Sequence, residues 1–144
     1  METSAKFQET IKDLNDVVTM HRELINLFRG GCCFAASVIA KECEKHDIPY
    51  KVISYKGDYY NKKNATLEQL AHDCELTHVA IDIDGTIIGG EVSGGWYDLV
   101  KDYHENVSSA DLKKIYENNI WNQIYNTELN ETIKQDIEMV FSMF

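Results

Sequence analysis

The run from His78 to Gly85 constrains the fold most strongly, because a strand pattern is followed at once by a turn signal. Side chains alternate along the run, with Val79, Ile81 and Ile83 on one face and His78, Ala80 and Asp82 on the other. This two-residue period is typical of a strand with one buried face. The Asp84-Gly85 dipeptide that follows is a strong signal for a two-residue hairpin turn. The chain is therefore predicted to contain an antiparallel sheet.

A two-residue turn at this point also fixes the pairing of the two strands. The expected pairs are Ile83 with Thr86, Asp82 with Ile87, Ile81 with Ile88, Ala80 with Gly89, and His78 with Glu91. Side chains that face each other across an antiparallel pair lie close enough to interact. We therefore expect the Glu91 carboxylate beside the His78 ring on one face of the sheet.

Two helical patterns precede the hairpin. From Ala5 to Phe28 apolar residues recur at mostly three- or four-residue spacing, which predicts an amphipathic helix in the N-terminal part of the chain, residues 1–28. Gly30 and Gly31 end this helix, and a second one begins near Cys32 or Cys33. The second helix carries a stripe of mostly small residues and is expected to be the buried central helix. The stripe consists of Cys33, Ala36, Ile39, Ala40 and Cys43.

The other elements complete an α+β pattern. Pro49 ends the central helix, and Lys51–Tyr55 is expected to form a strand. A short helix is expected from Thr66 to Glu75. Beyond Asp98 the chain is expected to turn helical, with one helix over about 108–125 and another that starts at 127 or 130. The predicted fold class is α+β, with a central helix packed on a small antiparallel sheet of three or four strands and extra helices at both ends.

Length and charge exclude several classes of protein. The 144 residues, 44% of them hydrophobic, are expected to form a single domain, residues 1–144. It divides into the N-terminal helix (1–28), a central core (29–98) and the C-terminal helices (108–144). The 24 acidic and 14 basic residues give a net charge of -10, which disfavours binding to nucleic acid or anionic membrane.

The cysteines and the N-terminus indicate a cellular compartment. Two of the four cysteines are adjacent, which is a poor disulfide framework, so we expect reduced thiols. The N-terminus lacks a signal-peptide pattern, and no apolar run approaches the roughly 18 residues of a membrane span. These features favour a soluble cytoplasmic protein.

The Arg29-Gly30-Gly31-Cys32-Cys33 run places a thiol at the start of a helix. The first-turn N–H groups and the helix dipole favour a thiolate there. A thiol nucleophile also needs an imidazole as general base and a third group that orients the imidazole. The candidate catalytic residues are Cys33 as nucleophile, His78 as base and Glu91 as orienting carboxylate, with Asp82 as the alternative third residue.

These residues and their order resemble the papain-like cysteine hydrolase superfamily, which includes transglutaminase-like and NlpC-like domains. The Arg29-Gly30-Gly31-Cys32-Cys33 run is also similar to the Arg-Gly-Gly-x-Cys motif of arylamine N-acetyltransferases, and this comparison selects Cys33 over Cys32. The resemblance covers about residues 26 to 95. It implies a cysteine at the start of a central helix and a histidine at the start of a later strand. At the position where the acetyltransferase pattern has its aspartate, this chain has Gly89, two residues before Glu91.

The predicted function is a thiol hydrolase that cleaves an amide or isopeptide bond of a peptide or protein substrate through a Cys33 acyl-enzyme. No cofactor or metal is expected, and a zinc site built from Cys74, His78 and Cys32 or Cys33 is the rival use of these residues. The alternative is a non-enzymatic bacterial or phage protein that keeps the papain-like fold and acts in the host cytoplasm or the virion. Its C-terminal apolar stripe, which ends at Phe144, would dock a protein partner or a second copy.

Overall fold

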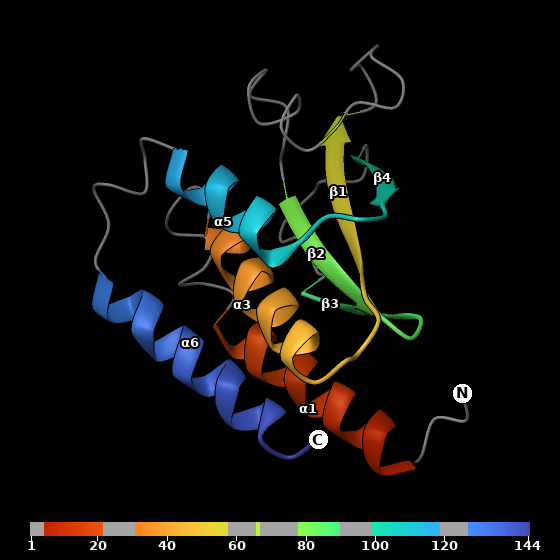
Figure 1. The fold of residues 1–144 in the computed structure, drawn as a ribbon, viewed down its shortest axis with the longest axis vertical. Coiled ribbons are helices and arrows are strands. Elements are labelled where there is room, and N and C mark those ends of the chain that lie inside the picture. Colours follow the sequence, from red (N-terminus) through yellow and green to blue (C-terminus); the bar gives the residue numbers. More distant parts are fainter. Residues whose placement is uncertain (1–4, 22–30, 58–65, 67–77, 90–98, 119–126) are drawn as a thin grey trace.

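A computed structural model describes residues 5–21, 31–57, 66, 78–89, 99–118 and 127–144 (Figure 1). Its helices are α1 (Ala5–Met20), α3 (Gly31–Lys45), α5 (Ser109–Asn118) and α6 (Thr127–Phe141). Its strands are β1 (Lys51–Gly57), β2 (His78–Ile83), β3 (Thr86–Ile88) and β4 (Leu99–His104). The strands form one antiparallel sheet in the order β3-β2-β1-β4. This confirms the α+β class and the small antiparallel sheet.

The β2–β3 hairpin has the predicted turn and register. Ile83 pairs with Thr86, Asp82 with Ile87, and Ile81 with Ile88. Asp84 and Gly85 both have positive φ angles, 52° and 86°, as a two-residue turn of the favoured hairpin type requires. The Asp82 carboxylate accepts a hydrogen bond from the Gly85 N–H at 2.9 Å, which holds the turn. Glu91, expected opposite His78, lies outside the described residues.

Strand β4 corrects the sequence analysis, which predicted that the chain turns helical after residue 98. Leu99–His104 instead pairs with β1 along its whole length and extends the sheet. Lys101 and Asp102 stand in the middle of this segment and hide the apolar alternation that identified the hairpin strands. Charged side chains suit this position because β4 lies at the edge of the sheet that the described residues form.

One face of the sheet carries the helices (Figure 1). Alternate residues of the strands point into a core that they share with α1, α3, α5 and α6. The sheet contributes Val52, Val79, Ile81, Ile83 and Ile88 to this core, and α3 contributes Cys33, Ala36, Ile39, Ala40 and Cys43. The predicted stripe of α3 is therefore confirmed as the buried face of the central helix. A stripe of mostly small side chains lets a helix lie close to a sheet.

The opposite face of the sheet has a smaller buried cluster. Ile53, Tyr55 and Ala80 are buried there, and Ile87 packs against them. These residues alternate with those of the helix-side core, as the strand period requires. The two faces of β2 are thus distinct, with Val79 toward the helices and Ala80 away from them.

The central helix α3 ends in a Schellman cap. The Ile48 N–H donates to the Cys43 carbonyl at 2.9 Å, and the Asp47 N–H donates to the Glu44 carbonyl at 3.4 Å. Asp47 has a φ of 55°, the left-handed conformation that this cap places just after a helix. Pro49 follows, so the predicted stop is confirmed, although the turn itself is made by Asp47.

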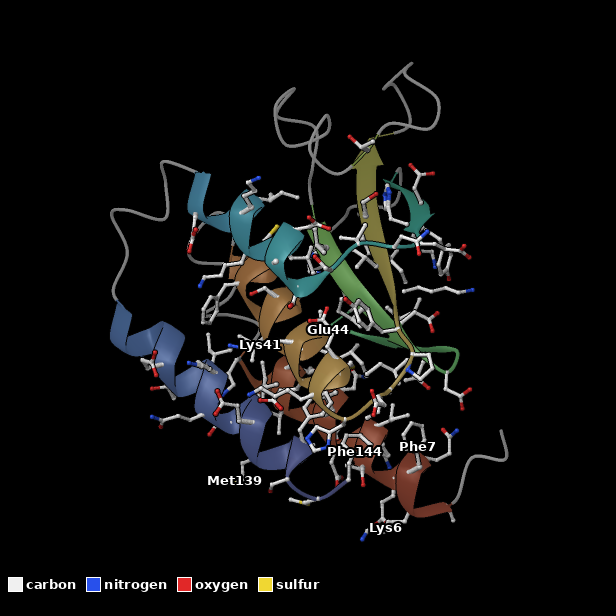
Figure 2. All side chains as sticks on the ribbon, in the orientation of Figure 1. Lys6, Phe7, Lys41, Glu44, Met139 and Phe144 are labelled. Carbon is white, nitrogen blue, oxygen red and sulfur yellow. The ribbon has the colours of Figure 1, made fainter. Side chains whose placement is uncertain are left out.

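Helix α6 packs against α1 and α3 and uses its apolar stripe inside the protein. Ile133, Ile137, Val140 and Phe141 are all buried in the helix-side core. Phe144 packs on Phe7 of α1, with ring centroids 5.3 Å apart, and Figure 2 shows these two side chains at the same end of the molecule. The stripe that was expected to dock a partner is therefore occupied by the chain's own core, apart from the half-buried Phe144.

Candidate functional site

Cys33 lies in the first turn of α3. Only 4% of its surface is exposed, and its side chain packs in the helix-side core. The first N–H groups of a helix have no partner within the helix, and the helix dipole adds partial positive charge at this end. Both effects stabilise a negatively charged sulfur. Burial in the apolar core acts in the opposite direction, because it disfavours a charged group, so Cys33 combines a helix start with little access to solvent.

His78 is the first residue of β2 and is buried, with 9% of its surface exposed. It pairs with Tyr55 of the neighbouring strand β1, and the centroids of the two rings are 5.3 Å apart. By the alternation of β2, His78 shares its face with Ala80, whereas Val79 points toward α3. The His78 side chain therefore leaves the strand on the face opposite the core that contains Cys33.

The His78 ring is oriented by a main-chain oxygen. Its Nε2 atom lies 2.5 Å from the Gly89 carbonyl oxygen. A carbonyl oxygen can only accept a hydrogen bond, so Nε2 must carry the proton. In the neutral ring the other nitrogen, Nδ1, is then the proton acceptor. The geometry therefore assigns Nδ1 as the basic atom of this imidazole.

Gly89 is itself held from two sides. Its N–H donates to the Asn15 side-chain oxygen at 3.1 Å, which ties it to α1. Its φ is 73°, a conformation that glycine adopts readily and other residues avoid. A Cβ at this position would lie 3.1 Å from Cγ1 of Val18, another α1 residue. The carbonyl that contacts His78 thus belongs to a residue that is fixed against the N-terminal helix.

The elements that carry the two central candidates lie side by side. Helix α3 packs against β2, and Figure 1 shows that both start at the same end of the molecule and run in the same direction. Cys33 and His78, near the starts of these elements, therefore lie toward the same end. The structure brings the elements together, while the two side chains leave on different faces of the sheet.

The other predicted candidates fall in different places. Asp82, the alternative third residue, lies toward the far end of β2 from His78 and uses one carboxylate oxygen to hold the hairpin turn. Glu91 and Cys74 lie outside the described residues, and so does the helix predicted from Thr66 to Glu75, apart from Thr66 itself. In the parts of the chain that are described, no three His, Cys, Asp or Glu residues gather as a metal site would require.

Two histidines outside the candidate site contact residues on distant elements, and His21 is buried while His104 is half-buried. His21 at the end of α1 is buried and contacts the Asp136 carboxylate of α6 at 2.7 Å. His104 lies in β4, and its Nε2 is 2.7 Å from the hydroxyl oxygen of Ser54, a fully buried residue of β1. Sequence reasoning missed both because each partner is more than 45 residues away and no local pattern marks it.

Cys43 provides a contrast to Cys33 within the same helix. Burial, the largest effect, together with the nearby charges of Glu44 and Glu42, raises the pKa of the Cys43 thiol to about 12. This residue lies near the C-terminal end of α3, where the helix dipole also opposes negative charge. Cys43 is therefore a structural thiol that stays protonated at neutral pH.

Comparisons with known proteins add no identification. A scan of protein-family models, a search of curated proteins and a search of solved structures each returned no match. None of the helices that the structure describes is long and apolar enough to cross a membrane.

Proposed function

We propose that this chain is a papain-like thiol hydrolase that cleaves an amide or isopeptide bond in a peptide or protein substrate, with Cys33 as nucleophile and His78 as general base. The observation that carries the proposal is the placement of Cys33 in the first turn of a helix that packs beside the strand begun by His78. A thiol, a helix N-terminus and an oriented imidazole are the components of a cysteine nucleophile site.

The chemistry proceeds through an acyl-enzyme. Nδ1 of His78 takes the proton of the Cys33 thiol, and the sulfur attacks the carbonyl carbon of the scissile bond. The carbonyl oxygen becomes negative and accepts hydrogen bonds from main-chain N–H groups in the first turn of α3. The imidazolium then gives its proton to the leaving amine as the C–N bond breaks, and a thioester remains on Cys33.

Water completes the turnover. Nδ1 of the neutral ring takes a proton from a water molecule, and the resulting hydroxide attacks the thioester carbonyl. The C–S bond breaks, the carboxylic acid product leaves, and the proton returns to the sulfur. This cycle needs no cofactor, because the thiol and the imidazole supply both the covalent and the acid–base chemistry.

The proposal sets one geometric requirement. His78 leaves β2 on the face opposite the core of Cys33, so its ring must meet the sulfur around the starting end of the strand rather than through the sheet. Among the described residues His78 is the first of β2, which places its ring near that end of the strand and supports this requirement.

An electrophilic active-site probe tests the proposal. A peptidyl epoxide that alkylates nucleophilic thiols is expected to modify wild-type protein at Cys33, as located by tandem mass spectrometry. Cys33→Ala should abolish this modification and His78→Ala should slow it strongly, while labelling of Cys43 stays negligible in all three proteins. Equal labelling of wild type, Cys33→Ala and His78→Ala would refute the proposal.

The burial of both central residues favours a second candidate, a non-enzymatic interaction protein with the same fold. Cys33 and His78 expose only 4% and 9% of their surfaces. On α6 and just beyond it, Met139 is 63% exposed and Met143 is 48% exposed, and Figure 2 shows Met139 on the outer side of the helix. Exposed methionines are adaptable contacts for a partner protein. This candidate predicts no probe labelling at Cys33, together with self-association or partner binding that Met139→Lys weakens in analytical ultracentrifugation.

A further inference from the structure

We propose that Asn15 of the N-terminal helix is a positioning residue for the His78 base, acting through the main chain of Gly89. The inference rests on the proposed hydrolase function. It assigns the third role of the site to a carbonyl oxygen, in the place where an acidic side chain was expected from the sequence.

The first step is the contact between His78 and Gly89. The Gly89 oxygen lies 2.5 Å from Nε2 and can only accept, so it selects the tautomer in which Nδ1 is basic. A carbonyl dipole that points at the ring also favours the imidazolium that forms during the reaction, although less strongly than a full negative charge. This oxygen thus orients the ring and stabilises its protonated form, as an orienting carboxylate would. It belongs to Gly89, the residue at the position where the arylamine N-acetyltransferase pattern has its aspartate.

The second step is the contact between Gly89 and α1. Asn15 is half-buried, and its side-chain oxygen accepts the Gly89 N–H at 3.1 Å. This bond is long-range in sequence and lies at the point where the chain leaves β3. The N–H and the carbonyl of Gly89 are separated only by the φ and ψ rotations of this residue, and its φ is 73°, so holding the N–H limits the directions that the carbonyl can take.

A second residue of α1 also contacts the hairpin and serves as a control. Gln8 of α1 also reaches the hairpin, where its side-chain N–H donates to the Asp84 carboxylate at 3.1 Å. This second bond is exposed and lies at the turn, away from His78. The two bonds both link α1 to the hairpin, and only the bond from Asn15 leads to the imidazole. Gln8→Ala is therefore a matched control.

The experiment measures the ring directly. In ¹⁵N-histidine-labelled protein, the nitrogen shifts of His78 report which ring nitrogen carries the proton. Wild type should show the Nε2-protonated tautomer. Asn15→Ala should mix the two tautomers and slow probe labelling of Cys33 by about 10- to 100-fold. If Asn15→Ala does not fold, the bulk-preserving Asn15→Leu takes its place and should have the same effects. Asn15→Asp keeps the acceptor and should behave like wild type, as should Gln8→Ala.

The outcomes separate this inference from the proposed function. An unchanged tautomer and labelling rate in folded Asn15→Ala or Asn15→Leu would overturn the role of Asn15 while the hydrolase proposal stands. Wild-type protein that resists labelling at Cys33 would end the hydrolase proposal and with it the catalytic role of Asn15, whatever the tautomer. Equal losses in Asn15→Ala and Gln8→Ala would also overturn the inference, because they would show only general loosening of α1.

Discussion

Gly89→Ala tests whether the hairpin is docked on α1 as closely as the structure requires. Two physical costs apply at this position. Alanine must adopt the φ of 73°, which costs a residue with a Cβ about 1–2 kcal/mol. Its new methyl group also lies 3.1 Å from Cγ1 of Val18, a buried side chain that has to move by a few tenths of an ångström. Overpacking of this kind costs about 1–3 kcal/mol.

Gly85→Ala supplies the matched control. Gly85 has a similar φ of 86°, in the turn of the same hairpin, but a Cβ there would meet no atom within 4 Å. This variant carries the φ cost without the contact. The reduced entropy of the unfolded chain is the same for both alanine variants and cancels in the comparison. Gly89→Ala should therefore destabilise the protein by about 1–3 kcal/mol more than Gly85→Ala.

Urea unfolding followed by circular dichroism measures both free energies. A double-mutant cycle locates the extra cost, since Gly89→Ala should be less destabilising in a Val18→Ala background than in wild type. Equal destabilisation by Gly89→Ala and Gly85→Ala would refute the reasoning, because it would mean that Gly89 does not lie against α1.

Two further predictions concern α5 and the structural thiol. Ser108 and Asp111 cap α5 reciprocally, so Ser108→Ala should cost about 1 kcal/mol in urea unfolding. The backbone hydrogen bond from Ser108 lowers the pKa of Asp111. The ionised carboxylate therefore stabilises the fold at pH values above its unfolded pKa. The destabilisation caused by Asp111→Asn should be present at neutral pH and should disappear as the pH falls through the lowered pKa of Asp111. Burial raises the pKa of Cys43 to about 12, so iodoacetamide should modify Cys43 at neutral pH only after denaturation, as mass spectrometry of native and urea-treated protein would show.

The local parts of the fold could be predicted from the sequence because short-range signals determine them. Asp84-Gly85 set the turn and thereby three strand pairs, since positive φ at two successive positions selects that hairpin type. The three- and four-residue spacing of apolar side chains identified the buried faces of α1, α3 and α6. These features need only neighbours within a few residues.

Features that depend on distant partners could not be predicted. Strand β4 is specified by its pairing with β1, and its central Lys101 and Asp102 carry no strand signal. His21 is buried because α6 brings Asp136 to it. The acceptor for the His78 ring is the main-chain oxygen of Gly89, and no side-chain pattern reveals a backbone contact.

The candidate site also combines features that local sequence patterns predicted with features that depend on distant parts of the chain. The order of Cys33 and His78, together with the helix start, indicated a thiol site from the sequence alone. The face on which His78 leaves β2 also followed from the alternation, and the structure agrees with it. No sequence pattern could predict the tautomer of the His78 ring, because the tautomer depends on the position of the Gly89 carbonyl oxygen.

The pH dependence of Cys33 alkylation tests the central claim most directly, because the rate reports the thiolate that a neighbouring imidazolium stabilises. Iodoacetamide labelling of Cys33 should be measured from about pH 5 to about pH 9 in wild type and His78→Ala, with each site quantified by tandem mass spectrometry. The account predicts rapid labelling of wild type well below the ordinary thiol pKa of about 8.5 and loss of that acidic reactivity in His78→Ala. Superimposable profiles that rise only near the ordinary thiol pKa would contradict it.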